Sequence, residues 1–313
     1  MPTIGLGIQL WAQNTEWAPY LAAAKRVDEL GYDHLWTWDH LLAALGDPEH
    51  SVFEGYTALA AWAAVTDRTR LGLLVGANTL RNPAIVAKMI ATIDHISGGR
   101  AILGLGGGWH EREHAAYGIE FGHGFCDRLD WLEESLQIVR PLMAGEEVTH
   151  DGPRYRVDHL RLSPPPVQSR VPIMVGGVGE KKTLRSVARH ADIWNAQLTL
   201  DQAAHQMAVL RDHCEEVGRD PAEIEFTYNC KIVIRDSETE ARAVLDRQLE
   251  HNTLDPAAAD ESFWAGTIET VAERLAAFVE AGFSGFTIEQ LAPFDEETLE
   301  RLIKEVKPLV EGR

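Results

Sequence analysis

Eight short apolar runs recur along the chain and alternate with longer amphipathic stretches. This alternation restricts the fold more than any other feature of the sequence. Each run has the length of a strand, and each stretch between runs is long enough for a helix. Strands joined through helices pair in parallel by right-handed crossovers. The runs cover residues 4–10, 33–38, 70–77, 100–108, 171–177, 191–196, 224–234 and 285–291.

Local signals mark where some of the helices begin and end. Gly31 follows a periodic stretch as a stop signal, and Asn82-Pro83 supplies the residues preferred at the N-cap and first position of a helix. A doubly wound open sheet uses the same order of elements, but eight units in 313 residues fit a (β/α)8 barrel better. We therefore predict an α/β protein in which residues 1–313 form a single TIM-barrel domain.

Two segments exceed what a minimal barrel requires. Residues 146–170 indicate a hairpin that turns at Asp151-Gly152, followed by a proline-rich arm, and this insertion lies between the fourth helix and the fifth strand. Residues 252–266 precede one helix more than eight units need. Long irregular segments in compact domains are often lids or binding loops, and a solvated surface excursion is the alternative for both.

The charge and the cysteines exclude several classes of protein. The net charge of −19 argues against nucleic acid and membrane surfaces as partners, because both are anionic. The N-terminus lacks the basic and apolar regions of a signal peptide, and no apolar run approaches the roughly 20 residues that cross a bilayer. Three widely spaced cysteines suggest neither a disulfide framework nor a zinc site. We expect a cytoplasmic protein that acts on a small molecule.

The residues that follow the predicted strands are mostly flat aromatics, glycines and amides. In a barrel of this type the chemistry sits at the carboxyl ends of the strands. Such a set suits a large planar ligand with polar groups at one end and does not resemble a metal site. The residues are Gln9, Trp11, Asp39, His40, Gly76, Ala77, Asn78, Thr79, Gly106, Gly107, Gly108, Trp109, Gly176, Gly177, Gly179, Trp194, Asn195, Gln197, Glu289 and Gln290.

The glycine-rich stretch at 175–188 follows the fifth strand. Glycines between a strand and a helix let the backbone approach a ligand and leave helix N–H groups free for an anion, and Lys181 and Lys182 add positive charge there. A tight turn that merely uses glycine is the alternative. The stretch cannot be aligned with a Walker loop.

The sequence HEREH at 110–114 matches the zinc-protease motif HExxH. The longer metzincin motif fails, because Tyr117 and Glu120 stand where a glycine and a third histidine belong. Glu133 or Glu134 remains available as a third ligand. A charged, solvated helix start is the commonplace alternative, and we expect no metal.

Asp39 and His40 are the side chains at the predicted strand ends that are best suited to proton transfer. Histidine titrates near neutral pH, and a neighbouring carboxylate can tune it or contact the ligand. The alternative is an aspartate that caps the next helix beside a histidine bonded to a backbone carbonyl.

Four stretches together resemble the bacterial luciferase-like superfamily, and within it the branch of oxidoreductases that use the deazaflavin coenzyme F420. They are residues 38–40, 76–100, 103–121 and 175–196, and the resemblance runs over nearly the whole chain. It implies a single luciferase-like TIM barrel that holds a flavin or deazaflavin across its mouth in a homodimer. It also implies that HEREH carries no catalytic zinc.

The resemblance further implies roles for individual residues. His40 and Asp39 are the catalytic pair beside the reactive ring, and Gly76-Ala77 forms a non-prolyl cis peptide against the ring face. The implied cofactor-binding residues are Asp39, Gly76, Ala77, Asn78, Gly106, Gly107, Gly108, Trp109, Gly176, Gly177, Val178, Gly179, Lys181 and Asn195. The expected walls of the substrate pocket are Trp11, Trp38, Trp194 and Trp264, the last in a mobile lid.

We therefore predict an oxidoreductase that transfers hydride between bound coenzyme F420 and a small apolar or aromatic substrate. A monooxygenase that uses reduced FMN is the alternative in the same superfamily, and a non-catalytic flavin carrier and a zinc hydrolase are further alternatives. Charge does not decide the cofactor, because the basic residues Arg81, Lys181, Lys182 and Arg185 serve either phosphate tail. The loops that read the substrate carry no motif that names it.

Overall fold

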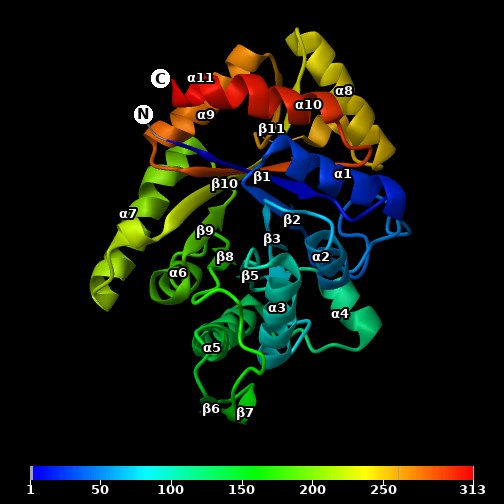
Figure 1. Ribbon diagram of the computed structural model, residues 1–313. Coiled ribbons are helices and arrows are strands. Elements are labelled where there is room, and N and C mark those ends of the chain that lie inside the picture. Colours follow the sequence, from blue (N-terminus) through cyan, green and yellow to red (C-terminus); the bar gives the residue numbers. More distant parts are fainter. Residues whose placement is uncertain (1–2, 260, 313) are drawn as a thin grey trace.

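The computed structural model describes residues 3–259 and 261–312, in which parallel strands form a barrel with helices around it (Figure 1). The strands are β1 Gly5–Leu10, β2 His34–Thr37, β3 Arg70–Leu73, β4 Gly76–Ala77, β5 Leu103–Gly106, β8 Ile173–Gly176, β9 Ile193–Ala196, β10 Glu225–Ile234, β11 Phe263–Gly266 and β12 Gly285–Gln290. Their order is β3-β2-β1-β12-β10-β9-β8-β5-β4, with β11 on β10. A parallel bridge between Leu71 and Ala101 joins β3 to the start of β5 and brings the two ends of the sheet together. The predicted barrel is confirmed, and each predicted run contains a strand.

The third predicted run is interrupted, and one expectation there is wrong. Among the described residues the non-prolyl cis peptide bond joins Leu74 and Val75, not Gly76 and Ala77. Gly76 and Ala77 instead form β4 and pair with Leu105 and Gly106 on β5. The interruption therefore falls in the two residues between β3 and β4, where Leu74 N–H donates to the Thr37 carbonyl at 2.8 Å.

Helices cover the outside of the barrel. They are α1 Trp17–Leu30, α2 Gly55–Ala63, α3 Pro83–Ser97, α4 Glu111–Tyr117, α5 Phe125–Met143, α6 Thr183–His190, α7 Leu200–Val217, α8 Glu238–His251, α9 Ile268–Glu280, α10 Glu296–Arg301 and α11 Lys307–Glu311. Helix α3 begins as predicted, because the Asn82 side chain accepts the Ala84 N–H at 2.9 Å and Pro83 occupies the first turn. Helix α1 ends at Gly31, whose φ of 83° is left-handed.

The apolar core has two parts. The larger part lies between the strands and the surrounding helices. The smaller part fills the barrel itself with Trp36, Leu74, Ile102, Met174 and Ile193. This inner plug lies below the residues at the carboxyl ends of the strands, so the barrel is filled and the site above it has a closed floor.

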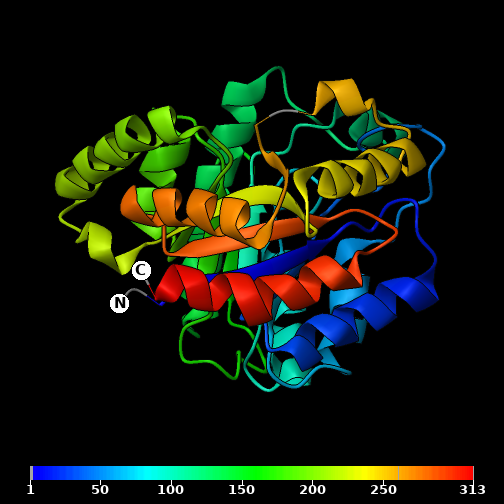
Figure 2. The same ribbon diagram turned by 90° about the horizontal axis from the view of Figure 1, so that it is seen from above.

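The chain returns to its start at the C-terminal end. Figure 2 shows α1 and α10 along the same side of the barrel as β1. The Ile4 N–H donates to the Glu311 carboxylate at 3.1 Å, which ties α11 to the residues before β1. None of the described helices is long and apolar enough to cross a membrane.

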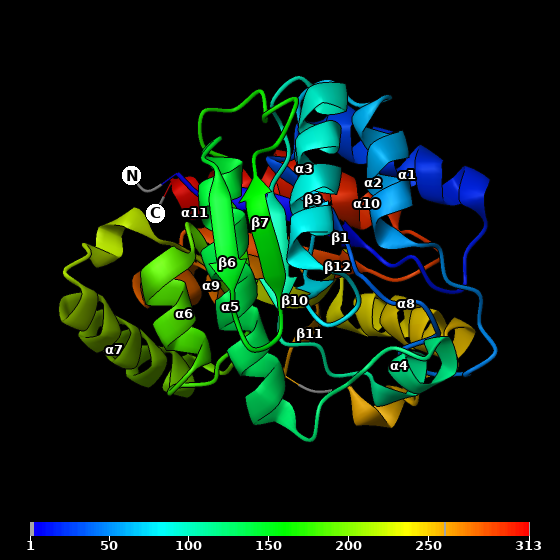
Figure 3. The same cartoon turned by 90° about the horizontal axis from the view of Figure 1, so that it is seen from below.

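The two predicted insertions differ in kind. Residues 146–170 contain the expected hairpin, formed by β6 Val148–Asp151 and β7 Arg156–Leu160, and it lies beside α5 (Figure 3). Residues 252–266 contain the short 3-10 helix Pro256–Ala258 and then β11, which pairs in parallel with β10. Trp264, expected in a mobile lid, lies in this strand and is 3% exposed. The second segment thus extends the sheet where a lid was expected.

Candidate active site

A cavity of about 500 Å³ opens at the carboxyl ends of the barrel strands. It gathers residues that are far apart in the sequence, as the predicted barrel requires. The lining residues are Gln9, Trp38, Asp39, His40, Leu45, Leu74, Val75, Gly76, Ala77, Gly106, Gly107, Gly108, Trp109, Glu113, Phe125, Gly176, Gly177, Val178, Asn195, Gln197, Asn229, Lys231 and Glu289. Most of the residues predicted for cofactor binding are among them.

The side chain of Val75 occupies one side of this cavity, and glycines make room for it. A Cβ atom at Gly106 would lie 2.6 Å from Val75 Cγ2, and one at Gly176 would lie 3.1 Å from the same side chain. Contacts below 3.0 Å require something to move, so Gly106 cannot carry a side chain without displacing Val75. Gly106 and Gly176, both predicted to bind the cofactor, thus make room for Val75, which was not among the predicted site residues.

Asp39 lies at the end of β2 and is held by its neighbours. Its Oδ2 atom accepts from Arg81 at 2.7 Å and from the Ala77 N–H at 3.0 Å. Arg81 also donates to Glu54, the N-cap residue of α2, at 2.7 Å. Burial raises the pKa of the Asp39 carboxyl above its usual value, and Arg81 offsets only part of this effect. Asp39 Oδ1 is buried with no partner among the described residues.

His40 is oriented by the carboxylate of Glu113, which lies on α4. Its Nδ1 atom lies 3.2 Å from Oε1 of Glu113 on α4, and Glu113 Oε2 accepts the Leu41 N–H at 2.8 Å. Burial alone would raise the pKa of Glu113, but the hydrogen bonds from His40 and Leu41 outweigh it and hold that pKa below its usual value. An ionised Glu113 fixes the proton on Nδ1, so Nε2 of His40 is the nitrogen free to exchange a proton.

The HEREH stretch does not have the geometry of a zinc helix. His110 is the residue before α4 begins, so the two histidines do not lie one turn apart inside a helix. Both ring nitrogens of the buried His114 are engaged, Nδ1 with the His110 carbonyl at 2.9 Å and Nε2 with the Thr79 hydroxyl at 2.7 Å. Within residues 3–259 and 261–312 no cluster of three metal-ligating side chains occurs.

Several predicted site residues lie outside the cavity. Trp11 and Trp194 are fully buried one layer behind it, where Trp11 donates to Glu289 at 2.8 Å and Trp194 to the Gly177 carbonyl at 2.8 Å. Trp264 packs on Tyr228 and Phe278, away from the other predicted walls. Of the four predicted tryptophans, only Trp38 lines the cavity.

Three residues predicted to bind the cofactor also lie outside this lining: Asn78, Gly179 and Lys181. Asn78 links the end of β4 to α5, because its Nδ2 donates to the Arg128 carbonyl at 3.2 Å and its Oδ1 accepts from Ser135 at 2.7 Å. Lys182, which was expected with Lys181 to add positive charge at the glycine-rich stretch, is paired with Asp130 on α5 at 2.6 Å.

Two residues of β10 line the cavity and were not predicted. Asn229 and Lys231 alternate with buried apolar neighbours, so both face the barrel interior. Both contact Glu289, with Asn229 Nδ2 at 2.6 Å and Lys231 Nζ at 3.1 Å from Oε1. The signal was present in the sequence, since Glu225, Thr227, Asn229 and Lys231 are polar residues at every second position of the strand.

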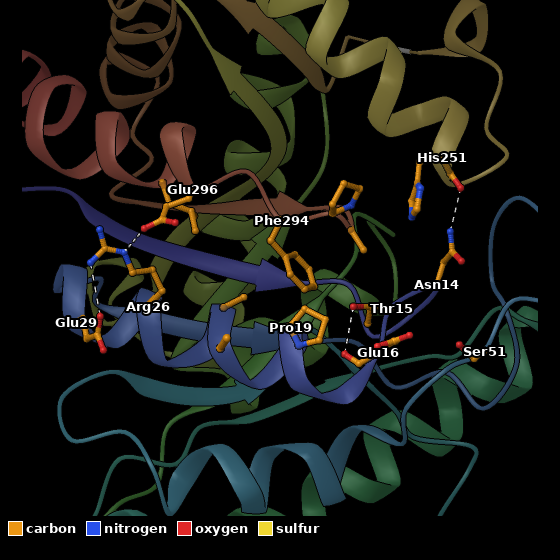
Figure 4. A pocket seen from close by; sticks show the side chains of 15 residues that line it. Asn14, Thr15, Glu16, Pro19, Arg26, Glu29, Ser51, His251, Phe294 and Glu296 are labelled. Atoms are coloured by element: carbon orange, nitrogen blue, oxygen red, sulfur yellow. Dashed lines mark hydrogen bonds and ion pairs between the residues drawn. The ribbon is translucent and has the colours of Figure 1, made fainter.

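A larger hollow of about 820 Å³ lies outside the barrel, between α1 and the segment that follows β12 (Figure 4). Pro19 and Phe294 form part of its apolar wall. Arg26 is paired with Glu296 at 2.8 Å, so the main cation of this hollow is already neutralised. It contains none of the predicted catalytic or cofactor-binding residues, and we place the active site at the barrel mouth.

Comparison with known proteins agrees with this architecture. The family described as luciferase-like monooxygenase matches residues 6–285. The chain belongs to this family. Uncharacterized proteins of Mycobacterium bovis and Mycobacterium tuberculosis are 33% identical over 179 residues, which cover 57% of this chain and 62% of theirs. The matched part of this chain therefore spans less than two thirds of the length of these relatives.

Two relatives whose names state an activity match longer segments of this luciferase-like chain. The F420-dependent hydroxymycolic acid dehydrogenase of Mycobacterium tuberculosis is 30% identical over 240 residues, covering 76% of this chain and 65% of that protein. The 5,10-methylenetetrahydromethanopterin reductase of Methanolobus tindarius is 30% identical over 250 residues, covering 75% and 71%.

Solved structures with this luciferase-like fold include users of both cofactors. An F420-dependent secondary alcohol dehydrogenase in complex with an F420-acetone adduct superposes with a TM-score of 0.86 at 20% identity, covering 98% of this chain and 99% of that one. The oxygenating constituent of 3,6-diketocamphane monooxygenase from Pseudomonas putida, in complex with FMN, has a TM-score of 0.76 at 19% identity and covers 98% and 99%. At these identities the likeness shows the fold alone.

Proposed function

We propose that this protein is an oxidoreductase that transfers hydride between bound coenzyme F420 and the alcohol or carbonyl carbon of a small organic substrate. The observation that carries the proposal is the His40–Glu113 pair at the wall of a glycine-lined cavity. The names of the two relatives that match three quarters of the chain support a dehydrogenase or reductase, and one of them is F420-dependent.

The residues at the mouth fit a planar heteroaromatic group. Gly106, Gly107, Gly176 and Gly177 present backbone without side chains to the cavity, and Val75 gives it an apolar wall. Trp38 Nε1 and Asp39 Oδ1 are buried polar atoms with no hydrogen-bond partner in the part of the chain that the structure describes. A buried donor and a buried acceptor require complementary groups, and the deazaflavin ring system carries both kinds.

In this proposal the deazaflavin, when bound, supplies a carbon that accepts or delivers the hydride. His40 supplies the proton step. During alcohol oxidation, Nε2 takes the hydroxyl proton while Glu113 stabilises the imidazolium that results; during carbonyl reduction, the same atom returns the proton. Asp39, held by Arg81 and the Ala77 amide, fixes the end of β2 and thereby the position of His40.

A monooxygenase that uses reduced FMN is the second candidate, because the FMN complex of a monooxygenase shares the fold. The glycine-lined mouth suits either ring. In a monooxygenase the same cavity would have to admit oxygen as well as the organic substrate, and substrate-dependent oxygen consumption would follow.

A parallel titration of the apo-protein with coenzyme F420 and with FMN, followed by fluorescence, tests the proposal. We expect micromolar or tighter binding of coenzyme F420 and weaker binding of FMN. The reverse preference, together with oxygen consumption, would make the protein a monooxygenase. His40→Ala should keep the affinity for the cofactor and lose turnover, whereas a carrier has no turnover to lose.

A further inference from the structure

At one end of the cavity the lining comes from β10 and β12 and is polar. The proposed proton transfer by His40 does not involve these residues. Lys231 pairs in register with Glu289 on β12, and Glu289 pairs in register with Gln9 on β1. All three line the cavity, together with the half-buried Asn229. Polar side chains therefore stand at one level across three neighbouring strands, directly above the apolar plug of the barrel.

Both carboxylate oxygens of Glu289 accept hydrogen bonds from the protein. Its Oε1 atom accepts from Asn229 at 2.6 Å and from Lys231 at 3.1 Å, and its Oε2 atom accepts from Trp11 at 2.8 Å. Lys231 is 7% exposed and Glu289 is 8% exposed, so this is a buried ion pair. The pair carries no net charge, which makes this end of the cavity a poor site for an anion or a cation.

Two hydrogen-bonding positions of this cluster remain for a ligand. The Lys231 ammonium has three N–H donors. One is met by Glu289, and the ring of Phe263 lies 4.5 Å from Nζ, which leaves a donor for a group in the cavity.

The second position is the acceptor Oδ1 of Asn229, which is buried and unpaired among residues 3–259 and 261–312. Its orientation is fixed, because a flipped amide would bring two acceptor oxygens within 2.6 Å.

We propose that Lys231 and Asn229 form a subsite for a second polar group of the substrate, apart from the carbon–oxygen bond that His40 serves. The donor Lys231 lies beside the acceptor Asn229, and Glu289 balances the charge of Lys231. This arrangement fits an uncharged group that both accepts and donates, and a hydroxyl is the simplest such group. The substrate class is then a neutral hydroxylated alcohol or ketone. This changes the sequence-based expectation of an apolar or aromatic substrate, and it rests on the proposed function.

The opposite rim of the cavity suits the carbon skeleton of such a molecule. Leu45, Trp109, Phe125 and Val178 line the opening and are among the exposed large apolar side chains of the protein. A ligand that spans the cavity would meet hydrogen-bonding groups at its inner end and apolar surface at its outer end.

Equilibrium binding to the F420-loaded protein tests the subsite without requiring turnover. Isothermal titration with 2-pentanol, 2,3-pentanediol and 2,4-pentanediol compares probes that differ by one hydroxyl and its position. We expect one diol to bind about 10- to 100-fold more tightly than 2-pentanol, as a hydrogen bond to a charged group predicts. The preference should fall to near one in Lys231→Met and in Asn229→Leu.

The affinity for coenzyme F420, measured on each variant, separates this inference from the proposed function. If the variants bind coenzyme F420 normally and lose the diol preference, the subsite belongs to the substrate. If they lose coenzyme F420 instead, the cluster serves the cofactor and the inference is wrong. Equal binding of all three probes by the unmodified protein would also overturn it. A wild-type protein that binds no coenzyme F420 at all contradicts the proposed function.

Two further variants serve as controls for folding and for the loss of a lysine. Lys231→Met leaves the buried Glu289 carboxylate without its ion-pair partner. If this single change unfolds the chain, the double variant K231M/E289Q replaces it, because it removes both charges. Lys304→Met removes a lysine from a surface pair with Glu300 and should change neither affinity.

Discussion

His40 and Glu113 are 73 residues apart in the sequence, and their side chains meet at 3.2 Å in the wall of one cavity. His40 follows β2, whereas Glu113 lies on the short helix α4 that follows β5. The contact joins two separate parts of the luciferase-like barrel, and in the proposed function the two side chains act together in proton transfer. It also gives Glu113, which occupies a variable position of the zinc motif, a partner in the cavity wall.

Replacing Glu113 by glutamine should slow the reaction while leaving the cofactor in place. A glutamine side chain at this position can still hydrogen-bond, but it cannot stabilise a positive charge on His40. We expect kcat to fall about 10- to 100-fold with the dissociation constant of coenzyme F420 unchanged. Glu111→Gln is the matched control on the same helix, because Glu111 is exposed. A zinc enzyme would show the opposite pattern, with Glu111 as the sensitive residue.

Arg81 should contribute strongly to the stability of the barrel mouth. It is bonded to both Asp39 and Glu54, and its guanidinium lies 4.8 Å from the centre of the Tyr56 ring. Arg81→Met leaves the buried Asp39 carboxylate without its cation, which costs about 3 to 5 kcal/mol in comparable pairs. Urea unfolding measures the loss. Arg81→Lys keeps the charge but not the two-pronged geometry, and it should lose less.

Gly106→Ala should disturb the cavity through Val75. The added methyl group would lie 2.6 Å from Val75 Cγ2, and overpacking of this kind typically costs about 1 to 3 kcal/mol. Weaker binding of coenzyme F420 should accompany the lower stability. Gly124→Ala is the control, because a Cβ there meets nothing within 4 Å and the φ of 177° suits any residue. Unchanged stability and binding in Gly106→Ala would contradict the packing described for Val75.

Asp28 should make stability depend on pH in the acid range. Burial alone would raise its pKa, but the hydroxyl of Thr69 and the N–H groups of Asp67, Arg68 and Thr69 together lower it from 3.8 to about 2. Because the pKa of Asp28 is lower in the folded state than in the unfolded chain, the ionised carboxylate stabilises the folded state above pH 3.8. This contribution is lost as the pH falls toward 2. It amounts to about 2 kcal/mol at neutral pH.

The comparison of the wild type with Asp28→Asn measures this contribution. The difference in the free energy of unfolding should be largest near pH 6 and should shrink between pH 4 and pH 2. Asp158→Asn, at a side chain that is 91% exposed on β7, should show little difference at any pH. A difference for Asp28→Asn that stays constant with pH would mean that its hydrogen bonds do not depend on its charge.

The sequence was sufficient for the barrel and for much of the cavity lining, because both follow from where the strands end. Asp39, His40 and the glycines at 106–108 and 176–177 lie where parallel strands place them. Bulk alone does not tell which side of a strand a tryptophan faces, and Trp11, Trp194 and Trp264 became core residues. The partnership of His40 with Glu113 depends on how α4 folds back, which no local pattern encodes.

Residues inside a predicted strand were harder to assign than residues after it. Asn229 and Lys231 lie within β10, which has ten residues and continues beyond them to Ile234, so a search for residues that follow a strand does not find them. Strand alternation identifies them only once the barrel interior is known to be polar at that level.

The close fit of Val75 against Gly106 and Gly176 has a consequence for how such a sequence can evolve. The three positions share one fixed volume, so a larger residue at one is tolerated only if another becomes smaller. Val75→Ala should therefore rescue Gly106→Ala, although each change alone is unfavourable. Across homologous sequences, position 75 and position 106 should then covary in size, and lineages with a small residue at 75 are the ones free to reshape this wall of the cavity.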